Sequence, residues 1–596
     1  MAVHSSAIGE LEGLIPEQEL VHRRLEAAQE AVNRWVLRRA ASDAGAGVPD
    51  SLDELAVAVR ELVSLGSDDG SNGQHAKIVL QELMVHLEDE FRQILISGTY
   101  FLPPGNLQAS RHNSIALPAR SFSFSSYLNL EELSISSFTT TTDDSQTYCS
   151  GFTRDSVSTE RVHLYLIDPE ASILLKEIAE LIILADHAPN LCRVYSEIRH
   201  STLMQCLYLL GVQSEHAAAI SEGGLNMQLY SRKVKLWIQG LKTFVGTVLP
   251  EERHACSQIF GCNNMVEQDC FTRGTTRCTQ ELLAVGTALA KANVQHCEKL
   301  PLLLQMHEEF AKLQPSLQDM FSGDARDLIS QEASMLLGKL EEAARGVLLD
   351  VSSLQFNHGL DECPALDGNI LAFTQFVIGF IKVLAEYSTS LNLIVHLEEE
   401  DGIKSTPMAP WERYVLRLLS HLQLKIEGES KVYKDERLRY IFLMNNAMYV
   451  LEHLRSLVLR MSFVYDQTHE KLVLLVEEYA TAYFRATWFA TMFHLKLRDE
   501  QNGTYPLDKR MVRSILKGRL KNFNLAFEEI RRVQTTWKVP NPQLRQHLRI
   551  VILNQVFPAY RTYLRRCSSL LSANPDKYIK YSPEDIENLV LDLFEG

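Results

Sequence analysis

Apolar residues recur at three- and four-residue intervals along most of this chain, which is the spacing of one buried helix face. Near the start, the stretch "VHRRLEAAQEAVNRWVLRRA" carries apolar residues at alternating four- and three-residue steps: Val21, Leu25, Ala28, Val32 and Trp35. This alternation is typical of a coiled-coil seam. We therefore predict a helix whose seam packs against at least one further helix.

A break rich in Gly, Ser and Asp, "GSDDGSNGQ", separates this helix from a second one. The second helix presents its apolar residues at helical spacing: Leu80, Leu83, Leu87, Phe91 and Ile94. The two helices can fold back on each other as a hairpin, or they can offer their seams to helices of another chain. The spacing alone favours the hairpin, because two heptads make only a short coiled coil.

The pattern changes between residues 98 and 160, where Ser and Thr are frequent and no helical period is sustained. This composition is typical of a flexible linker and of phosphorylation sites. From about residue 161 onward, helical periods follow one another almost without interruption. We therefore predict three regions: an N-terminal helical, coiled-coil-like region (1–97), the linker (98–160) and a helical-bundle region (161–596).

Many consecutive helical patterns without strand-like alternation predict an all-α chain. We expect an elongated rod of stacked antiparallel helical bundles, not a compact α/β enzyme. No regular repeat marks a consensus solenoid. The longest apolar run, residues 370–381, has twelve residues and is too short to cross a bilayer, so we interpret it as a buried core helix.

The N-terminal sequence lacks a basic region followed by an apolar core, so we expect no secretory signal, and neither end matches a lipidation motif. The ten cysteines are then expected to be reduced thiols of a cytoplasmic protein. Four of them are spaced six to eight residues apart, whereas structural zinc sites use pairs two to four residues apart: Cys256, Cys262, Cys270 and Cys278. The usual phosphate-binding, dinucleotide-binding, hydrolase and zinc-protease motifs are absent. We therefore expect no enzyme activity, no cofactor and no metal.

Charge is distributed unevenly along the chain. The formal charge of −16 disfavours indiscriminate nucleic-acid binding by the whole surface. Residues 501–580, however, contain sixteen Lys and Arg against four acidic residues: Asp508, Glu528, Glu529 and Asp576. One interpretation is a solubilising surface. We favour a basic C-terminal bundle, about residues 501–596, that meets an anionic partner.

Nucleic acid and an anionic membrane are the two candidate partners for this basic region. RNA-binding modules expose aromatic side chains for base stacking, whereas Phe523, Phe527 and Trp537 stand at core-like positions and no nucleic-acid module is recognisable. A membrane surface needs only clustered charge, at ~1 kcal/mol per basic residue near an anionic leaflet. We therefore favour a membrane and expect no nucleic-acid partner.

The chain ends with "KYIKYSPEDIENLVLDLFEG". Ser582 is a good N-cap, Pro583 fits the first helical turn and Asp585 stands in the capping-box position. Apolar residues then follow at the spacing of one helix face: Ile586, Leu589, Val590 and Leu593. These features predict a short packed terminal helix, but they do not account for the lysines before it, Lys577 and Lys580.

Long stretches of the C-terminal half closely resemble the seventy-kilodalton subunit of the exocyst in its land-plant form. They are "ESKVYKDERLRYIFLMNNAMYVLEHL" (429–454), "LKNFNLAFEEIRRVQTTWKVPNPQLRQHLRI" (520–550), "PAYRTYL" (558–564) and the terminal segment just quoted. Weaker similarity extends upstream over residues 87–95, 192–212 and 235–260. The resemblance therefore covers most of the chain apart from the linker.

The resemblance implies a non-enzymatic tether that holds secretory vesicles at the plasma membrane before fusion. It implies N-terminal helices that form coiled coils with other exocyst subunits, which would make the seam a partner-binding surface through Val21, Leu25, Val32 and Trp35. It also implies that the C-terminal end contacts phosphatidylinositol 4,5-bisphosphate. The family's lysines in the "KYIKY" segment correspond to Lys577 and Lys580, and we expect supporting contacts from Lys517, Lys521, Arg565 and Arg566.

Three functions follow from these considerations. The first is the exocyst tether, a cytoplasmic protein that is peripheral at the plasma membrane. The second is a divergent plant paralogue that acts as an immune or autophagy-related adaptor through a peptide-binding groove, with small GTPases or pathogen effectors among its partners. The third is an enzyme, which the absent motifs disfavour.

Overall fold

The structure is a computed structural model that describes residues 17–41, 52–68, 70–99, 166–212, 226–294, 297–352, 367–395, 408–496, 509–570 and 579–596. Within these ranges every regular element is a helix, and extended pairing is limited to two isolated bridges, Thr99 with Ile167 and Lys538 with Glu595. The predicted all-α fold class is therefore confirmed. Most of the predicted linker lies outside the described residues.

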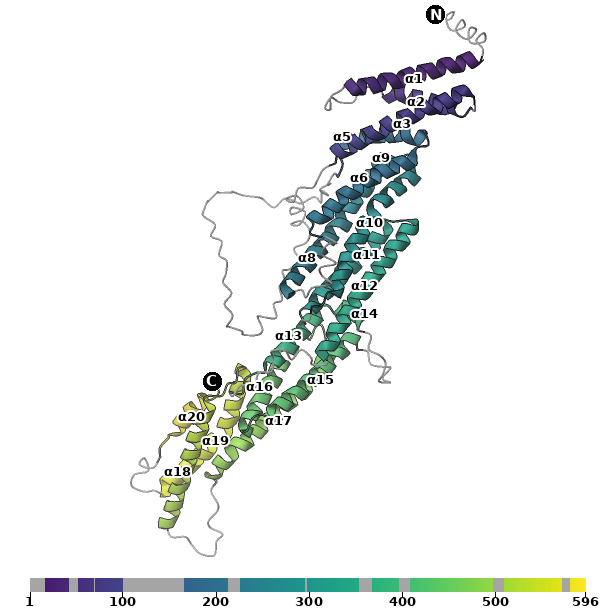
Figure 1. Cartoon of the computed structure of the whole chain (residues 1–596). Coiled ribbons are helices and arrows are strands. Elements are labelled where there is room, and N and C mark those ends of the chain that lie inside the picture. Colours follow the sequence, from purple (N-terminus) through teal and green to yellow (C-terminus); the bar gives the residue numbers. More distant parts are fainter. Residues whose placement is uncertain are drawn as a thin grey trace, which may run out of the picture. The chain divides into compact units, whose positions relative to one another are not determined.

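The contacts within the chain divide it into two compact units, coloured purple to teal and teal to yellow in Figure 1. The first unit holds the described helices up to Ala344. The second holds those from Arg345 to the C-terminus. Helix α12 (Gly323–Ser352) contributes residues to both units.

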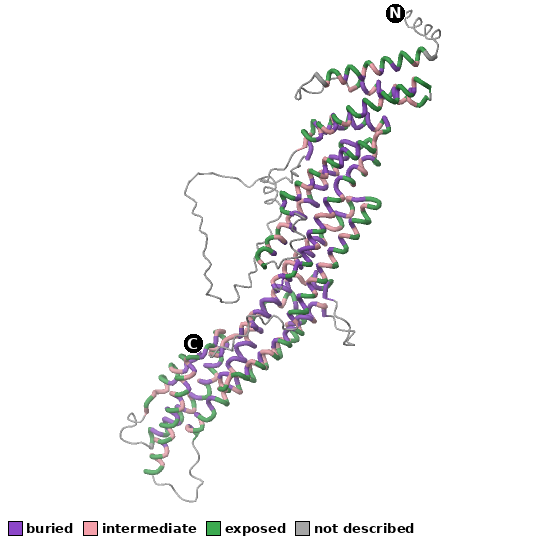
Figure 2. Tube along the Cα trace, in the orientation of Figure 1, coloured by how far each residue is buried: buried purple, intermediate pink, exposed green. Residues whose placement is uncertain are grey.

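The first unit is a succession of helices that each pack on the next layer. Its elements are α1 (Glu17–Ala41), α2 (Leu52–Gly66), α3 (Ser71–Ser97), α5 (Pro169–Leu184), α6 (Ala188–Leu209), α8 (Met227–Thr243), a π-helical turn (Phe244–Val248), α9 (Leu249–Phe260), α10 (Asn264–Lys291) and α11 (Lys299–Asp319). Helices α1, α2 and α3 pack in order, α3 contacts α5 and α6, α6 contacts α10, and α8 contacts α11. Each helix therefore buries a stripe rather than its whole surface (Figure 2). The sequence analysis predicted two helices before the linker and missed α2.

A buried ion pair lies at the centre of the first unit. Arg199 of α6 and Glu252 of α9 are both fully buried, and the guanidinium donates to the carboxylate over 2.6 Å. Tyr195 donates to the same carboxylate at 2.9 Å, and Arg199 also donates to Thr99 at the end of α3. Burial opposes the charge on Arg199, but Glu252 outweighs it and raises the pKa of the guanidinium above its ordinary value. This network joins α3, α6 and α9 through one charged centre.

The second unit is likewise built of helices that pack on one another. Its elements are α13 (Ala372–Glu386), α14 (Ser388–Ile394), α15 (Pro410–Ser430), α16 (Glu436–Arg455), α17 (Ser462–Phe493), α18 (Lys509–Gln534), α19 (Pro542–Leu570) and α20 (Pro583–Leu591). Helix α16 packs on α13, α15 and α17, while α17 packs on α18 and α19, and α20 covers part of α19. Stacked helical packing is therefore present within each unit.

The predicted core helix at residues 370–381 is α13, and its apolar side chains are buried, among them Phe376, Phe380 and Ile381. No single described helix is both long and apolar enough to span a bilayer. Helices α13 and α14 reach the length and apolar composition of a membrane span only when they are taken together, and they bend by 92° at their junction.

The terminal helix begins as predicted. Ser582 accepts a hydrogen bond from the amide of Asp585, and the Asp585 carboxylate accepts one from the amide of Ser582, which completes the capping box. Ile586, Val590 and Leu593 are buried, and Leu589 packs at the edge of the same core.

Two adjacent asparagines of α16 fix the connections of the second unit. The Asn446 side-chain oxygen accepts from the Leu371 amide (3.0 Å) and the Thr374 hydroxyl (2.7 Å) at the start of α13. The Asn445 side-chain nitrogen donates to the carbonyls of Gly368 (2.7 Å) and Lys538 (2.8 Å). The asparagine pair therefore ties the segment before α13 to the turn between α18 and α19.

The same turn holds the C-terminus. The Lys538 amide donates to the Asp367 carbonyl, the Val539 amide to the Phe594 carbonyl, and the Phe594 amide to the Gln534 carbonyl. Gly368 has a φ of +78°, and a side chain at this position would meet Leu438 and Ile441 of α16, so it would be both strained and crowded. Four segments that are distant in sequence therefore meet at one node: residues 367–374, α16, the turn 535–541 and residues 593–595.

We predict that Asn446→Ala destabilises the second unit. The substitution leaves the Leu371 amide and the Thr374 hydroxyl, both buried, without their acceptor, at a cost of about 2 kcal/mol. For a unit of this size that corresponds to a fall of about 4–8 °C in the melting temperature. Asn554→Ala, on the exposed surface of α19, is the matched control and should melt like the parent. Equal melting curves for both variants would contradict the structural role of the node.

Candidate functional site

One end of the second unit is basic, and the helical stretches that form it in the described part of the chain contain no Asp or Glu. Residues 479–496 at the end of α17, residues 509–527 of α18 and residues 542–570 of α19 together contain thirteen Lys and Arg and no Asp or Glu. Figure 1 shows α18 and α19 side by side at the yellow end of the chain. Positive charge is therefore concentrated where these three helices meet.

The register of α18 against α19 brings four of the predicted lipid-binding residues together. The Tyr563 hydroxyl donates to the Leu516 carbonyl at 3.0 Å, and the rings of Phe523 and Tyr560 stack with centroids 5.1 Å apart. The helices are thus antiparallel, and their basic residues fall within about two turns of one another: Lys517, Lys521, Arg565 and Arg566. The side chains of Lys521, Arg565 and Arg566 are exposed, whereas that of Lys517 is half-buried.

The two lysines of the "KYIKY" segment have different positions. Lys577 lies outside the described residues. Lys580 is exposed, but its amine donates to the Glu528 carboxylate of α18 at 2.6 Å and lies 5.4 Å from the centre of the Tyr581 ring. The hydrogen bond to Glu528 raises the pKa of Lys580, and the same bond lowers the pKa of Glu528. The charge of Lys580 is therefore partly neutralised within the chain.

The acidic residues of α20 lie away from the basic end of the second unit. The Tyr560 hydroxyl donates to the Tyr581 carbonyl just before α20, and Arg549 donates to the Leu593 carbonyl just after it. Helix α20 with its acidic residues thus runs along α19 from about residue 560 back to residue 549. Residues 561–570 of α19 lie beyond this stretch, and Arg561, Arg565 and Arg566 have no acidic partner among the described residues.

Several other basic residues of the region have structural partners within the chain. Arg549 is buried and Arg545 half-buried, and both pair with Glu595 at 2.7 Å. Arg532 pairs with Glu529 one turn away. Arg519 donates to the Lys496 carbonyl at 2.7 Å and so joins the end of α17 to α18. The excess of charge counted from the sequence therefore overstates the charge available to a partner.

The three aromatic residues that the sequence analysis placed at core-like positions are core residues. Phe523, Phe527 and Trp537 are all buried. They belong to the cluster that also includes Tyr560, Tyr563 and the apolar face of α20. They are therefore unavailable for stacking on nucleic-acid bases.

The N-terminal seam is buried inside the chain. Leu25, Val32 and Trp35 are buried and Val21 is partly exposed, in a helix that packs on α2 and α3. Arg24 pairs with Glu61 of α2, and Arg39 pairs with the buried Glu90 of α3. The seam thus packs within the chain, but in a group of three helices with α2 between α1 and α3, and not in the two-helix hairpin of the sequence analysis. Pairing of these residues with another subunit stays a prediction.

The four clustered cysteines face different partners. Cys256 lies 3.3 Å from the Tyr195 hydroxyl, Cys270 lies 3.1 Å from Cys192, Cys278 lies 3.2 Å from a ring nitrogen of His200, and Cys262 is exposed. Within the described residues, no three His, Cys, Asp or Glu side chains are placed to hold a metal ion.

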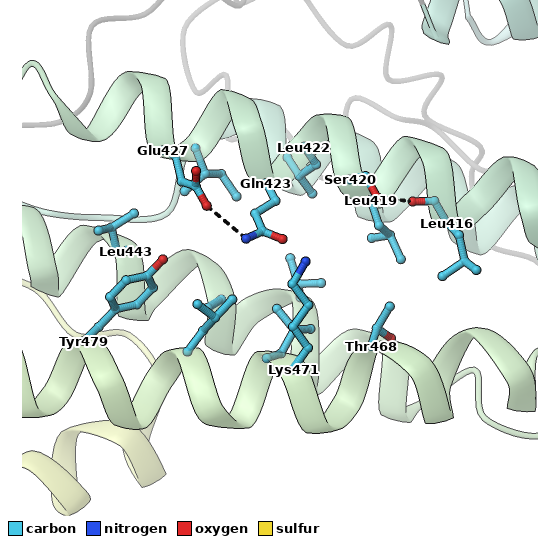
Figure 3. A pocket seen from close by; sticks show the side chains of 15 residues that line it. Leu416, Leu419, Ser420, Leu422, Gln423, Glu427, Leu443, Thr468, Lys471 and Tyr479 are labelled. Atoms are coloured by element: carbon cyan, nitrogen blue, oxygen red, sulfur yellow. Dashed lines mark hydrogen bonds between the residues drawn. The ribbon is translucent and has the colours of Figure 1, made fainter.

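An apolar groove lies between α15 and α17 over α16 (Figure 3). Its floor consists of buried residues from α15 and α16: Leu419, Leu422, Ile426, Leu443, Ala447 and Val450. Polar side chains line its rim, with Gln423 donating to Glu427 at 2.9 Å on one side and Lys471 and Thr468 on the other. The cavity has a volume of about 90 Å³, enough for one or two apolar side chains of a partner.

Helices packed in succession on one another define the chain as an all-α protein built of stacked helices. The family model that describes the C-terminal part of the Exo70 subunit of the exocyst complex matches residues 235–592. The chain therefore belongs to the Exo70 family of exocyst subunits, and membership implies other exocyst subunits as partners.

The similarity extends over nearly the whole chain. Exocyst complex component EXO70A1 of Arabidopsis thaliana is 28% identical over 97% of this chain and 89% of its own length. Exocyst complex component EXO70B1 of the same plant is 26% identical over 96% of this chain and 89% of its own length. Human exocyst complex component 7 is 27% identical over 38% of this chain and 32% of its own length.

A solved structure supports the fold independently. Exo70 of S. cerevisiae superposes with a TM-score of 0.54 over 98% of this chain and 99% of its own length, at 12% identity. At that identity the likeness concerns the fold alone. The resemblance stated from the sequence is therefore confirmed at the level of family and fold.

The sequence analysis missed two features of the site. Arg561 belongs to the basic end but was not among the predicted lipid-binding residues. The groove between α15 and α17 was expected only in general terms, because its lining comes from three helices whose spatial order the sequence does not state. A search for stretches without acidic residues would have found α19 and the end of α17.

Proposed function

We propose that this exocyst subunit tethers secretory vesicles at the plasma membrane by binding anionic phosphoinositide, such as phosphatidylinositol 4,5-bisphosphate, through the basic end of its second unit. The observation that carries the proposal is the separation of charge along α18 and α19. Lys521, Arg565 and Arg566 are exposed there without acidic partners among the described residues. The carboxylates of α20 lie beside residues 549–560 of α19 instead. Lys517 and Arg561 extend the same surface, and the segment 571–578 with Lys577 follows directly from α19.

The ion pair of Lys580 makes the "KYIKY" lysines less important in the proposed lipid contact. A lysine that already donates to Glu528 gains less from a lipid phosphate, because it must first give up that partner. We therefore place the exposed residues of α18 and α19 at the centre of the contact and Lys580 at its border. The non-enzymatic role and the peripheral location at the plasma membrane are parts of the same proposal.

We predict that the triple variant Lys521→Ala/Arg565→Ala/Arg566→Ala binds phosphoinositide vesicles about a hundredfold more weakly than the parent at low salt. Each charge near an anionic surface contributes ~1 kcal/mol, so three contribute about 3 kcal/mol. The deficit should shrink as salt rises, because ions screen the parent's contact. Vesicle sedimentation with and without phosphatidylinositol 4,5-bisphosphate measures the effect. A matched control removes the same number of charges from exposed positions in the first unit, Arg60→Ala/Lys77→Ala/Lys291→Ala, and should bind like the parent.

The same assay resolves the role of Lys580. Glu528→Gln releases Lys580 and removes one negative charge beside the basic end, so it should strengthen binding roughly fivefold at low salt. Lys577→Ala/Lys580→Ala should weaken it, but by less than the triple variant does. If the triple variant and its first-unit control bind equally, the proposed surface is wrong.

The proposal includes pairing of the N-terminal seam with another exocyst subunit. The seam is packed within the chain, so pairing requires a partner helix to join or replace the contacts of α1 with α2 and α3. We predict that Trp35→Ala reduces co-purification of the other exocyst subunits, whereas Leu37→Ala, at a position 69% exposed on the same helix, does not. If Trp35→Ala lowers only the melting temperature, α1 serves the intramolecular packing alone.

A second candidate function is a divergent adaptor in immunity or autophagy-linked traffic, with small GTPases or pathogen effectors as partners. The groove between α15 and α17 favours it, because an amphipathic helix could place apolar side chains between these two helices. The co-purification experiment separates the two candidates. A tether carries the other exocyst subunits with it at equal stoichiometry, whereas an adaptor is recovered without them.

A further inference from the structure

The last turns of α17 expose two phenylalanines on one face. Phe489 is 60% exposed and Phe493 is 50% exposed. Arg485 precedes them by one turn and Lys496 follows just after the helix, and both are also exposed. At helical spacing, one side of the helix carries positions 485, 489, 493 and 496. This face therefore presents two aromatic rings with a cation before them and a cation after them.

The opposite face of the same turns is packed in the core. Trp488 and Leu495 are buried in the cluster that includes Leu516 and Leu520 of α18. The core therefore fixes the rotation of α17 and directs the two phenylalanines outward. The two neighbouring exposed rings form an apolar surface rimmed by polar side chains, and larger surfaces of this kind mark protein or membrane interaction sites.

The charges around this face favour an anionic lipid surface as its partner. The stretch 479–496 contains Arg485, His494 and Lys496 and no acidic residue. The amine of Lys496 lies 4.9 Å from the centre of the Phe489 ring, so charge and aromatic ring are presented together. Aromatic rings flanked by long basic side chains are typical of the membrane interface, where the ring enters the headgroup layer and the cation meets phosphate.

The face adjoins the proposed lipid-binding surface of the same unit. Arg519 of α18 donates to the Lys496 carbonyl, so the end of α17 is bound directly to the basic half of α18. A membrane that meets the exposed cations of α18 and α19 is therefore close to the end of α17 as well.

We propose that Phe489 and Phe493 insert into the interfacial layer of an anionic membrane while Arg485 and Lys496 contact its headgroups. This inference rests on the proposed function and extends it, because it adds an apolar contact that salt does not screen. Binding would then have two parts: an electrostatic part from α18 and α19, and an insertion part from α17.

The test measures both the binding of variants to vesicles and the depth at which position 493 enters the lipid layer. Phe489→Ser/Phe493→Ser should weaken binding to phosphatidylcholine vesicles containing phosphatidylinositol 4,5-bisphosphate about tenfold, and the deficit should persist at high salt. Leu424→Ser/Leu474→Ser, at similarly exposed apolar positions of α15 and α17, is the matched control and should bind like the parent. In separate variants, a tryptophan at position 493 (Phe493→Trp) should be quenched by brominated lipids, whereas one at position 474 (Leu474→Trp) should not.

The outcomes distinguish this inference from the proposed function. If Lys521→Ala/Arg565→Ala/Arg566→Ala loses binding while the serine variant binds fully and Phe493→Trp is not quenched, the membrane contact is purely electrostatic and the insertion is wrong. If the parent itself does not bind these vesicles, the proposed function fails and the insertion fails with it. Loss of exocyst subunits from the serine variant, without loss of vesicle binding, would assign the face to a protein partner and overturn the inference.

Discussion

The second unit depends on the hydrogen bonds of two adjacent asparagines, Asn445 and Asn446. Both are buried in α16, and their amide groups reach backbone or side-chain groups of two other segments, residues 367–374 and the turn 535–541. Buried backbone amides and carbonyls outside regular helices need partners, and here a single dipeptide supplies them. The node therefore determines where α13 begins, where α18 turns into α19 and where the C-terminal residues lie.

The position of the node explains how charge is separated. Gln534, at one end of α18, takes part in the node, whereas Lys509 begins α18 about 38 Å away at the other end. The C-terminal residues return to the node, so α20 lies along the near part of α19 and brings its carboxylates with it. The far ends of α18 and α19 are left with their cations and without acidic neighbours on α20. The basic surface is thus a consequence of chain connectivity as much as of composition.

Local patterns in the sequence predicted the features that depend on a few neighbouring residues. The Ser582 cap, the buried face of α20, the core helix α13 and the burial of Phe523 and Phe527 all follow from spacing or capping chemistry. Helix α2 was missed because its residues, 52–66, lie directly before the Gly-rich break, and their apolar pattern was not distinguished from that break.

Features that depend on distant residues could not be predicted in the same way. Lys580 pairs with Glu528, which is 52 positions away, so the sequence could not show that the charge of this exposed lysine is partly neutralised within the chain. The exposure of Phe489 and Phe493 depends on which face of α17 meets α18 and α19. The resemblance to a family pointed to the correct fold, but the division of its basic residues into structural and available ones required the packing.

We propose that the far ends of α18 and α19 meet an anionic membrane. Hydrogen–deuterium exchange of the full chain, with and without vesicles containing phosphatidylinositol 4,5-bisphosphate, tests it most directly. We expect slower exchange in peptides from residues 509–527 and 560–570 with these vesicles, and no change with vesicles of phosphatidylcholine alone. Slower exchange confined to the first unit, or unchanged exchange throughout the second unit in a sample where the chain is bound to the vesicles, would contradict it.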